Sequence, residues 1–439
     1  ETTYILPGTG SRTTTFGYGE SGCYPTQATI TTSPTSVPGR TSYTTYDIVG
    51  RLLSATDALG FVTTYAYDGR GRLTQITYPD GTGEIYAYNS QQGTVTHTAQ
   101  NGRMTITYQD AKGREYRVID GTTQTILSTK TYNTLGQLIR MGGCETDAYY
   151  TYTTYVYDAI GRVISEKTYN QDQVLVAQTN TAYQSSTHRI TTTKVGDTNA
   201  PSISTRSTYN GLGQVVSTVS GRSQYTYTYD FVGNRITETD VQGNRTTSTY
   251  DAFGRVLSVT DAMGATTSSS YASLGHVLTV TNALGATSTA VYNALGQKTM
   301  DITPIDANQN RVVYYTYDLL GRLIEESTSL DGVRNSIAQT VYDNMSRPIS
   351  RQVWEDANLL AETTYTYTAL GQVQTETTGT STQTYGYDLY GNCVSVTDAL
   401  GQIETTTYDK QGDVLTKTDR NGTIFVYSYY TPGMVAEET

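Results

Sequence analysis

The feature that most constrains this chain is a tyrosine followed by aspartate or asparagine that recurs at a nearly constant spacing. The steps from Tyr46 to Tyr67 to Tyr88 are each 21 residues, and other steps run from 20 to 26 residues. The full copies are Tyr46, Tyr67, Tyr88, Tyr132, Tyr157, Tyr209, Tyr229, Tyr250, Tyr292, Tyr317, Tyr342, Tyr387 and Tyr408, and degenerate copies are Tyr108, Tyr183, Tyr271, Tyr367 and Tyr429. A fixed period of this length indicates an array of units that each pack on their neighbours.

The segment 250–271 shows what one unit folds into. Arg255 to Thr260 is rich in β-branched residues and has no helical period, Asp261 to Gly264 is a turn signal, and Ala265 to Tyr271 is again strand-prone. An aspartate at the start of a turn can accept hydrogen bonds from its own backbone, and a glycine at the fourth position tolerates a left-handed φ. Each unit is therefore predicted to read strand, turn, strand, turn.

A second glycine follows most of the repeat tyrosines by four residues and is itself followed by Arg, Gln, Asn or His, as in Gly50-Arg51, Gly161-Arg162 and Gly321-Arg322. With this motif, the chain resembles the RHS-repeat, or YD-repeat, family from Tyr46 to Tyr429. The resemblance implies a long β-sheet that spirals into a hollow shell. In bacterial toxins and toxin-complex subunits of the family the shell encloses another polypeptide, and in teneurin-like proteins it is a filled extracellular barrel.

We therefore predict an all-β fold of repetitive antiparallel units of about 21 residues in one long spiralling sheet, a hollow β-shell or barrel. Two parts are predicted. Residues 1–42 are an irregular segment rich in Pro and Gly, either an edge or plug or two decayed repeats, and residues 43–439 are the repeat array. Because no signal peptide is visible and residue 1 is Glu, we interpret the chain as a fragment of something longer.

Composition excludes several classes of function. The net charge of −11 leaves no basic stripe for nucleic acid, and no apolar run is long enough to span a membrane. Hydrophobic residues make up 36%, and tyrosine, with 40 copies, supplies much of that share. This composition favours a sheet covered by Tyr and Thr over a conventional apolar core.

The repeated Tyr-x-Tyr pairs, such as Tyr65 and Tyr67, have two readings. Residues i and i+2 share a face of a strand, so neighbouring copies can form tyrosine ladders, or they can present an aromatic stripe to carbohydrate. We favour the ladders, because a residue needed in every repeat usually serves packing.

The arginine after each turn glycine is expected to pair with the turn aspartate, for example Arg72 with Asp68 and Arg255 with Asp251. The repeat-turn residues singled out as structural are Tyr67, Asp68, Gly71, Arg72, Tyr157, Asp158, Gly161, Arg162, Tyr250, Asp251, Gly254, Arg255, Tyr317, Asp318, Gly321 and Arg322.

From Tyr292 to Tyr367 the steps lengthen to 25 residues. The extra residues are expected to form loops at 305–310, 330–335 and 355–358, which project from one edge where repeat proteins often bind partners.

No arrangement for catalysis, cofactor binding or metal binding is evident, so none is predicted. His97, His188 and His276 lie far apart, and Asp306 to Asn310 carries only the first half of a calcium loop. Cys393 occupies an apolar position and is expected to be a buried thiol, whereas Cys23 and Cys144 could pair. Sequons at Asn244, Asn344 and Asn421 are candidate glycosylation sites.

Three functional hypotheses follow. The first is a non-enzymatic scaffold of a secreted or cell-surface protein that encloses a polypeptide. The second is an adhesin-like module that binds cell-surface glycans through tyrosines or long loops. The third is a self-associating fibre subunit that joins its copies through free repeat edges. All three place the protein outside the cell or on its surface.

Overall fold

The computed structural model describes residues 2–6, 10–18, 24–33, 40–143, 150–185, 188–195, 203–272, 275–306, 308–330, 333–409, 412–431 and 434–438. Within these ranges the chain forms 39 strands and no helix. Each strand pairs in antiparallel fashion with the strand before it and the strand after it, from β1 through to β39. The predicted all-β fold of antiparallel strands in a long sheet is confirmed.

The strands of the first half are β1 (Thr2–Leu6), β2 (Gly10–Tyr18), β3 (Pro25–Ser33), β4 (Arg40–Tyr46), β5 (Leu52–Thr56), β6 (Val62–Tyr67), β7 (Leu73–Thr77), β8 (Gly83–Asn89), β9 (Thr94–Thr98), β10 (Met104–Gln109), β11 (Glu115–Asp120), β12 (Ile126–Tyr132), β13 (Leu138–Gly142), β14 (Thr151–Tyr157), β15 (Val163–Asn170), β16 (Leu175–Ser185), β17 (His188–Val195), β18 (Ile203–Tyr209) and β19 (Val215–Ser220).

The strands of the second half are β20 (Ser223–Tyr229), β21 (Arg235–Thr239), β22 (Arg245–Tyr250), β23 (Val256–Thr260), β24 (Thr266–Tyr271), β25 (Val277–Thr281), β26 (Thr287–Tyr292), β27 (Lys298–Pro304), β28 (Asn310–Tyr317), β29 (Leu323–Leu330), β30 (Val333–Tyr342), β31 (Pro348–Glu355), β32 (Asn358–Tyr367), β33 (Val373–Thr378), β34 (Ser381–Tyr387), β35 (Cys393–Thr397), β36 (Ile403–Tyr408), β37 (Val414–Thr418), β38 (Ile424–Thr431) and β39 (Met434–Glu438).

The repeat motif builds one kind of hairpin over and over. In the turn after Tyr67, the Gly71 amide donates to the Asp68 carbonyl, and the Asp68 amide donates to the Arg72 carbonyl, both at 2.9 Å. Gly71 has a φ of 82°, which a β-branched residue would not tolerate. The strand register shifts by one residue between Ala66 and Tyr67. This is a type I turn closed by a glycine bulge, and it explains why Asp and Gly keep their spacing.

Because strands alternate in direction, the turns lie on two opposite edges of the sheet. We call the edge formed by the turns that follow the repeat tyrosine the first rim, for example 47–50, 68–71, 251–254 and 318–321. The opposite edge, formed by turns such as 57–60, 78–81, 261–264 and 398–401, is the second rim.

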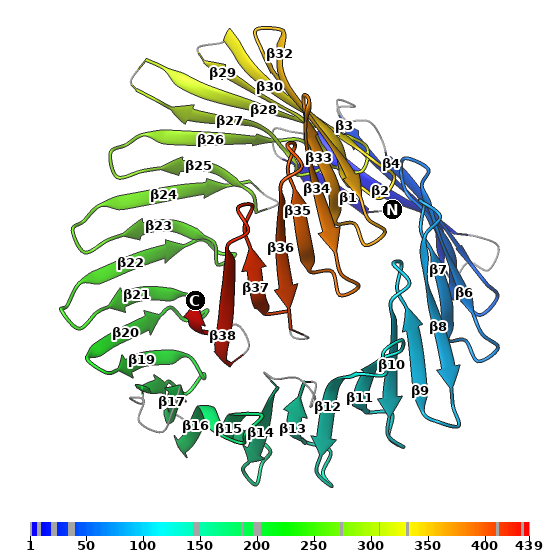
Figure 1. Ribbon diagram of the computed structural model, residues 1–439. Helices are drawn as coiled ribbons and strands as arrows, with labels where there is room; N and C mark the ends of the chain where they lie inside the picture. The colour runs from blue at the N-terminus through cyan, green and yellow to red at the C-terminus, as the bar shows by residue number, and fades with distance from the viewer. Residues whose placement is uncertain are drawn as a thin grey trace.

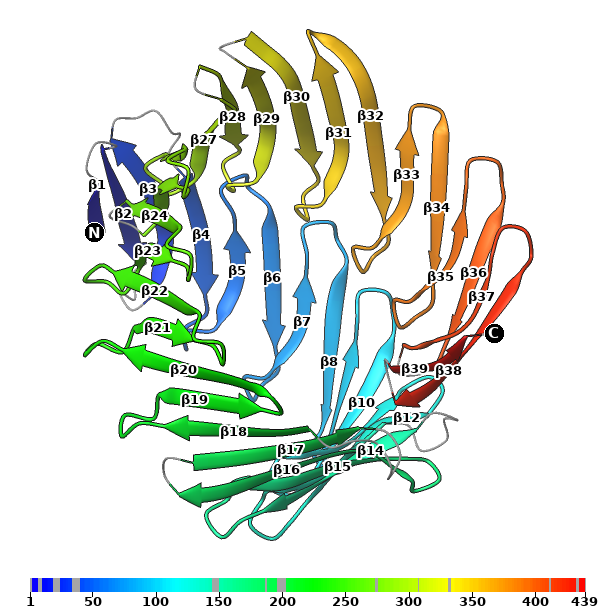
Figure 2. The same ribbon diagram turned by 90° about the vertical axis from the view of Figure 1, so that its left-hand side faces the viewer.

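The sheet curves round until it meets itself (Figures 1 and 2). After a full circuit, β28 to β36 run alongside β4 to β11, so that a second coil lies on the first. Hydrogen bonds between the two coils join residues 257 to 288 positions apart in sequence. One coil therefore takes about 13 of the 21-residue units.

Of the three loops predicted between Tyr292 and Tyr367, the one that begins at Ile305 is present: β27 ends at Pro304, β28 begins at Asn310, and the Ile305 amide donates to the Gln309 carbonyl. The other two predicted loops are a correction. The extra residues lengthen the strands instead, so that β30 and β32 have 10 residues where β23 has 5. The segment 355–358 is a tight turn in which Asp356 and Ala357 both have positive φ. Pairing continues because the inserted residues are themselves strand-forming.

The sheet encloses almost no apolar core of its own. Among the described residues the buried hydrophobic side chains are Ile119, Tyr150, Val176, Ala294 and Val313. On β6 and β36 exposed and half-buried side chains alternate, and the repeat tyrosine lies on the half-buried face. Stability must therefore come mainly from contacts between neighbouring strands and turns.

The N-terminal segment is part of the same sheet. Its described residues form β1, β2 and β3, and β3 pairs with β4 from Gln27–Tyr43 to Ile30–Arg40. The described part of the chain has no helix that could cross a membrane.

Candidate functional site

The polar side chains of the repeat motif form a fixed unit on the first rim. Asp68 Oδ1 accepts hydrogen bonds from the backbone amides of Arg70 and Arg72, and its Oδ2 accepts one from Arg72 Nε at 2.8 Å. One carboxylate thus organises the whole turn and also holds the arginine side chain.

The held arginine reaches the next repeat. The Arg72 guanidinium lies 4.2 Å from the centre of the Tyr88 ring, and the Tyr88 hydroxyl donates back to the Leu73 carbonyl at 2.9 Å. Each repeat is therefore linked to the next by a cation–π contact and a hydrogen bond. We call one aspartate, its arginine and the following tyrosine a rung.

The other predicted turns repeat this geometry. Arginine donates to its aspartate, at 2.6 to 2.7 Å, in the pairs Arg162–Asp158, Arg255–Asp251 and Arg322–Asp318. The arginines then cover Tyr183, Tyr271 and Tyr342, and the repeat tyrosines Tyr157, Tyr250 and Tyr317 donate to carbonyls of Leu138, Arg235 and Lys298. The ion pairs predicted for Asp68 and Asp251 are formed.

Other residues in the arginine position keep part of the rung. Asn293 donates to Gln297 at 2.9 Å, Asn392 donates to Asp388, and His276 stacks on Tyr292 with ring centres 4.7 Å apart. These substitutes retain a hydrogen bond or a stacked ring without the charge.

The rung also sets the ionisation of its aspartates. Hydrogen bonds from the Arg72 backbone and then its side chain lower the pKa of Asp68, and the Arg255 side chain is the largest cause that lowers the pKa of Asp251. Burial raises the pKa of Asp318, but the bonds from Arg322 outweigh it and the net change is downward. These carboxylates are charged at neutral pH.

Contacts between the coils pair the first rim of the second coil with the second rim of the first coil. Asn344 Nδ2 donates to the Pro79 carbonyl at 2.9 Å, and Asn101 Nδ2 donates to the Leu389 carbonyl at 3.3 Å. The Arg103 guanidinium lies 4.2 Å from the Tyr390 ring centre.

At the start of this overlap Arg40 takes part as well. Its guanidinium donates to Gln297 Oε1 at 3.2 Å and to the Asp318 carbonyl at 3.3 Å. Three separate places along the overlap thus hold one coil on the next.

A cluster of ionisable groups lies around Glu84. Its carboxylate accepts from the hydroxyls of Tyr78 and Tyr86 and contacts His97 Nε2 at 2.9 Å, and His97 stacks on Tyr86. Hydrogen bonding to Glu84 and then burial raise the pKa of Tyr86 to about 12, and burial and then Glu84 raise the pKa of Tyr78 to about 12. The Tyr86 hydrogen bond is the largest cause that lowers the pKa of Glu84. Both hydroxyls stay protonated at neutral pH and donate to the Glu84 carboxylate.

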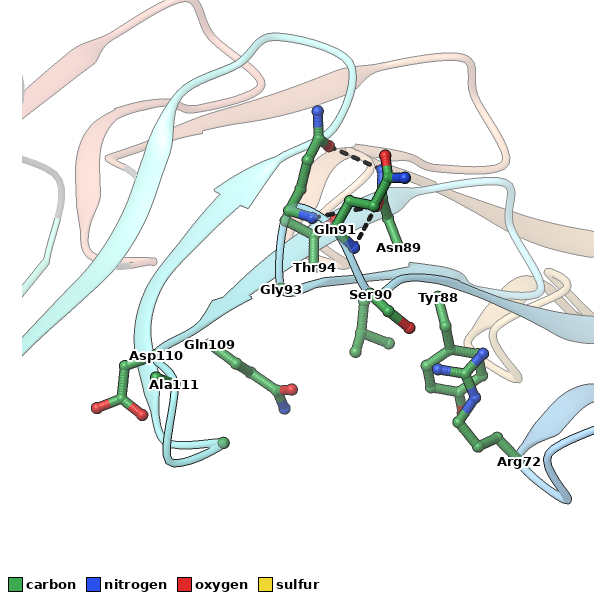
Figure 3. Close-up of a pocket in the computed structure, with 13 residues that line it drawn as sticks. Arg72, Tyr88, Asn89, Ser90, Gln91, Gly93, Thr94, Gln109, Asp110 and Ala111 are labelled. Atoms are coloured by element: carbon green, nitrogen blue, oxygen red, sulfur yellow. Dashed lines mark hydrogen bonds between the residues drawn. The ribbon is translucent and has the colours of Figure 1, made fainter.

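A polar pocket of about 530 Å³ opens on the first rim where one rung is missing (Figure 3). The turn Asn89 to Gly93 is followed by Thr94, which is buried, so no arginine fills the space between Arg72 and Asp110. Asn89 instead organises its own loop through bonds with the Gln91 and Gln92 amides. The loss of the Gly-Arg pair after Tyr88 was the sequence signal for this pocket.

A second groove, of about 400 Å³, lies over β29 to β33. Its lining residues are Leu323, Glu326, Ala338, Thr340, Tyr342, Pro348, Arg351, Tyr365, Tyr367 and Val373. Its floor includes repeat tyrosines whose rings are already covered by arginine, as Tyr367 is by Arg347.

The remaining predicted positions are distributed along the sheet. Asn244 is exposed and bonds Asp240, Asn421 lies in an exposed turn, and Asn344 is held between the coils. Cys393 is half-buried rather than buried. Cys23 and Cys144 lie outside the described residues.

No group of three or more His, Cys, Asp or Glu side chains that could hold a metal occurs among the described residues. Asp306 caps its own turn, with Oδ1 accepting the Asn308 amide at 2.8 Å.

Comparison with known proteins gives two family matches. The RHS Repeat model matches residues 39–82 and 387–424, and the Teneurin YD-shell model matches residues 165–349. A segment of 132 residues is 30% identical to Double-stranded DNA deaminase toxin A of Burkholderia cenocepacia (strain H111) and covers 30% of this chain and 9% of the toxin.

Solved structures share the fold. The Photorhabdus luminescens Tc holotoxin pore matches 98% of this chain with a TM-score of 0.68 and 15% identity, and TcdB2-TccC3-Cdc42 matches 96% with a TM-score of 0.62 and 15% identity. The chain spans 27% and 26% of those chains, so it corresponds to about a quarter of their length.

Proposed function

Because this chain is an RHS/YD-repeat protein, we propose that its sheet is a structural wall, secreted or on the cell surface, that encloses another polypeptide. The role is non-enzymatic: the wall shields its contents and carries out no reaction. The likeness to the deaminase toxin spans 9% of that toxin, so its activity is not transferred to this chain.

The observation that carries this proposal is that the sheet coils back and contacts itself. Its second coil is held on the first by bonds such as Asn344 to Pro79 and Arg40 to Gln297. The strands between the first and the last described one are each paired with a strand on both sides. Such a wall can separate an interior from solvent, as a single open ribbon cannot.

The polar chemistry of the chain fits a structural role. In units that carry an aspartate, an arginine and a tyrosine, these side chains hold the next unit, as Asp251, Arg255 and Tyr271 do. The neighbouring solved structures are Tc toxin assemblies, which supports the same general role.

The structure favours this role over glycan binding by the repeat tyrosines. A sugar stacks on an open ring face, but the rings of Tyr88 and Tyr342 are covered by Arg72 and Arg322. Two of the three long loops on which the glycan hypothesis also relied, those near Leu330 and Glu355, are replaced by longer strands.

Electron microscopy of the purified chain tests the closed wall directly. We expect ring-shaped particles of constant diameter. Extended ribbons of variable curvature would refute the proposal.

Protease protection tests enclosure. A polypeptide without a fold of its own, carrying a protease site, is attached after Thr439, and the matched control carries the same site in the exposed turn 398–401. We expect the control site to be cut first and the attached site to resist until urea opens the wall. Equal cleavage rates at both sites in the native protein would exclude enclosure.

A further inference from the structure

The two rims carry large apolar side chains that face solvent. On the first rim of the first coil Phe231 is 96% exposed and Phe253 is 83% exposed. On the second rim Met263 is 95% exposed and Leu284 is 94% exposed. The other apolar residues in the same turn positions that are more than 60% exposed are Ile48, Val49, Leu135, Ile160, Leu212, Val232, Val241 and Leu400.

Side chains in these turn positions are less exposed where the coils overlap, where Leu370, Leu389 and Tyr390 are 39%, 55% and 37% exposed. Ala294, on the first rim at the start of the second coil, is 4% exposed. Leu295, Leu320 and Met345, at the positions that correspond to Phe253, are half-buried. These residues lie among the turns that bond to the first coil through Arg40 and Pro79. The molecule thus already contains one interface between a first rim and a second rim.

Surface apolar residues in single positions need no explanation, but a row at one position of successive turns does. Where the coils overlap, the free first rim lies below β4 to β8 and the free second rim lies above β29 to β32, on opposite sides of the double layer (Figure 2). They are the two halves of the interface that the overlap joins.

We propose that a second copy of this chain docks on these rims, with the first rim of one copy on the second rim of the other. The interface would continue the contact between the coils and would bury Phe231 and Phe253 against turns such as 261–264 and 282–285. Because the contact joins two different surfaces, it does not close on itself and extends into an axial stack.

This contact differs from pairing between strand edges. The free strands β1 and β39 would add strands to the sheet, whereas the rims join turns to turns. The proposal also does not depend on what the wall encloses, so a monomeric but protective wall would refute this inference alone.

Sedimentation velocity of the full chain over a concentration series tests the proposal. We expect the mass to rise with concentration through multiples of the monomer. Two double variants each break one rim: Phe231→Ser with Phe253→Ser for the first rim, and Met263→Ser with Leu284→Ser for the second. Serine is well tolerated in turns, so the fold should be kept, and far-UV circular dichroism checks it.

Each double variant should raise the dissociation constant at least about tenfold, the effect of losing a central aromatic or apolar contact. A matched control, Ile85→Thr with Val156→Thr, removes exposed apolar residues from strands instead of rims and should associate like the unmodified chain. Mixing the two rim variants decides the geometry. Each retains one intact rim, so the mixture should form dimers and nothing longer.

Three results would overturn the proposal: an unmodified chain that stays monomeric throughout, rim variants that associate as strongly as the control, or a mixture of rim variants that forms no dimer.

Discussion

Removing the arginine from a shielded rung should cost more stability than removing it from an open one. Arg322 is 15% exposed in its side chain and makes four interactions. It donates to Asp318 at 2.6 Å, to the Asp343 carbonyl at 3.2 Å and to Ser346 at 3.1 Å, and it covers the Tyr342 ring at 4.6 Å. The Arg162 side chain makes two of these contacts in kind, with Asp158 and the Tyr183 ring, and is 43% exposed.

The size of the loss follows from these contacts. A hydrogen bond to a charged, largely buried partner contributes about 1.5–3 kcal/mol, and a cation–π contact about 0.5–2 kcal/mol. The two share one side chain and do not add fully, so we expect Arg322→Ala to lower the unfolding free energy by about 2–4 kcal/mol. Arg162→Ala should cost clearly less, because water screens an exposed pair and replaces its hydrogen bonds.

The assay has to distinguish a local loss of stability from a global one. In a repeat array each unit contacts only its neighbours, so part of the loss should be local opening. Urea unfolding followed by circular dichroism gives the global change. Amide hydrogen exchange should show protection falling in the turns 318–322 and 343–347 while the turn 68–72 is unchanged.

A matched variant identifies the interaction that matters. Arg322→Gln keeps a hydrogen-bonding group, as Gln297 does naturally with Asn293, and should recover part of the stability. The reasoning is refuted if Arg322→Gln and Arg322→Ala are equal, or if Arg162→Ala costs as much as Arg322→Ala.

Three further predictions concern acid, glycosylation and the described thiol. In the folded state the pKa of turn aspartates such as Asp68, Asp251 and Asp318 is lowered. Their charged forms therefore stabilise the fold at any pH above the unfolded-state pKa of about 3.9, and this stabilisation is lost as the pH falls through the lower folded-state pKa. The melting temperature should therefore be level from about pH 7 to 5 and drop below about pH 4, and a decline that is complete by pH 5 would contradict this account. When the protein is expressed in a eukaryotic secretory host, Asn244 and Asn421 should carry N-linked glycan. Asn344 should not, because its side-chain amide donates to the Pro79 carbonyl between the coils. Peptide mass mapping after glycosidase treatment measures the occupancy of each site, and full occupancy of Asn344 would mean that the coils separate. Burial is the largest cause that raises the pKa of the Cys393 thiol. In a Cys23→Ser, Cys144→Ser variant, Cys393 should therefore react with a thiol reagent more slowly in native than in urea-unfolded protein at the same pH. Equal reaction rates would place the thiol in open solvent.

The local structure was predictable because it is encoded within a few residues. Asp at the first and Gly at the fourth turn position specify the hairpin, and the positive φ of Gly71 and Gly254 follows from that chemistry. The pairing of Arg72 with Asp68 was also predictable, since both belong to one turn.

The long-range structure was not predictable in the same way. Nothing near Asn344 or Arg40 in sequence indicates partners about 260 residues away, because the length of a coil depends on small twists summed over many strands. The extra residues at 330–335 looked like loops because insertions usually are. Their strand propensity and the tight turn at Asp356 decided otherwise.

The overlap of the coils changes how local unfolding spreads through a sheet without an apolar core. A linear array opens wherever its weakest unit is, and the parts on either side become independent. Here Arg40, Pro79 and Asn101 tie the first coil to turns of the second, so the chain between them forms a closed loop. A rung lost inside that loop, such as the one at Arg162, leaves the two ends connected through the overlap. A rung lost at Arg322 weakens both the sheet and a turn that receives Arg40, since Asp318 belongs to both. The overlap is therefore the part of the wall where single substitutions should do most harm.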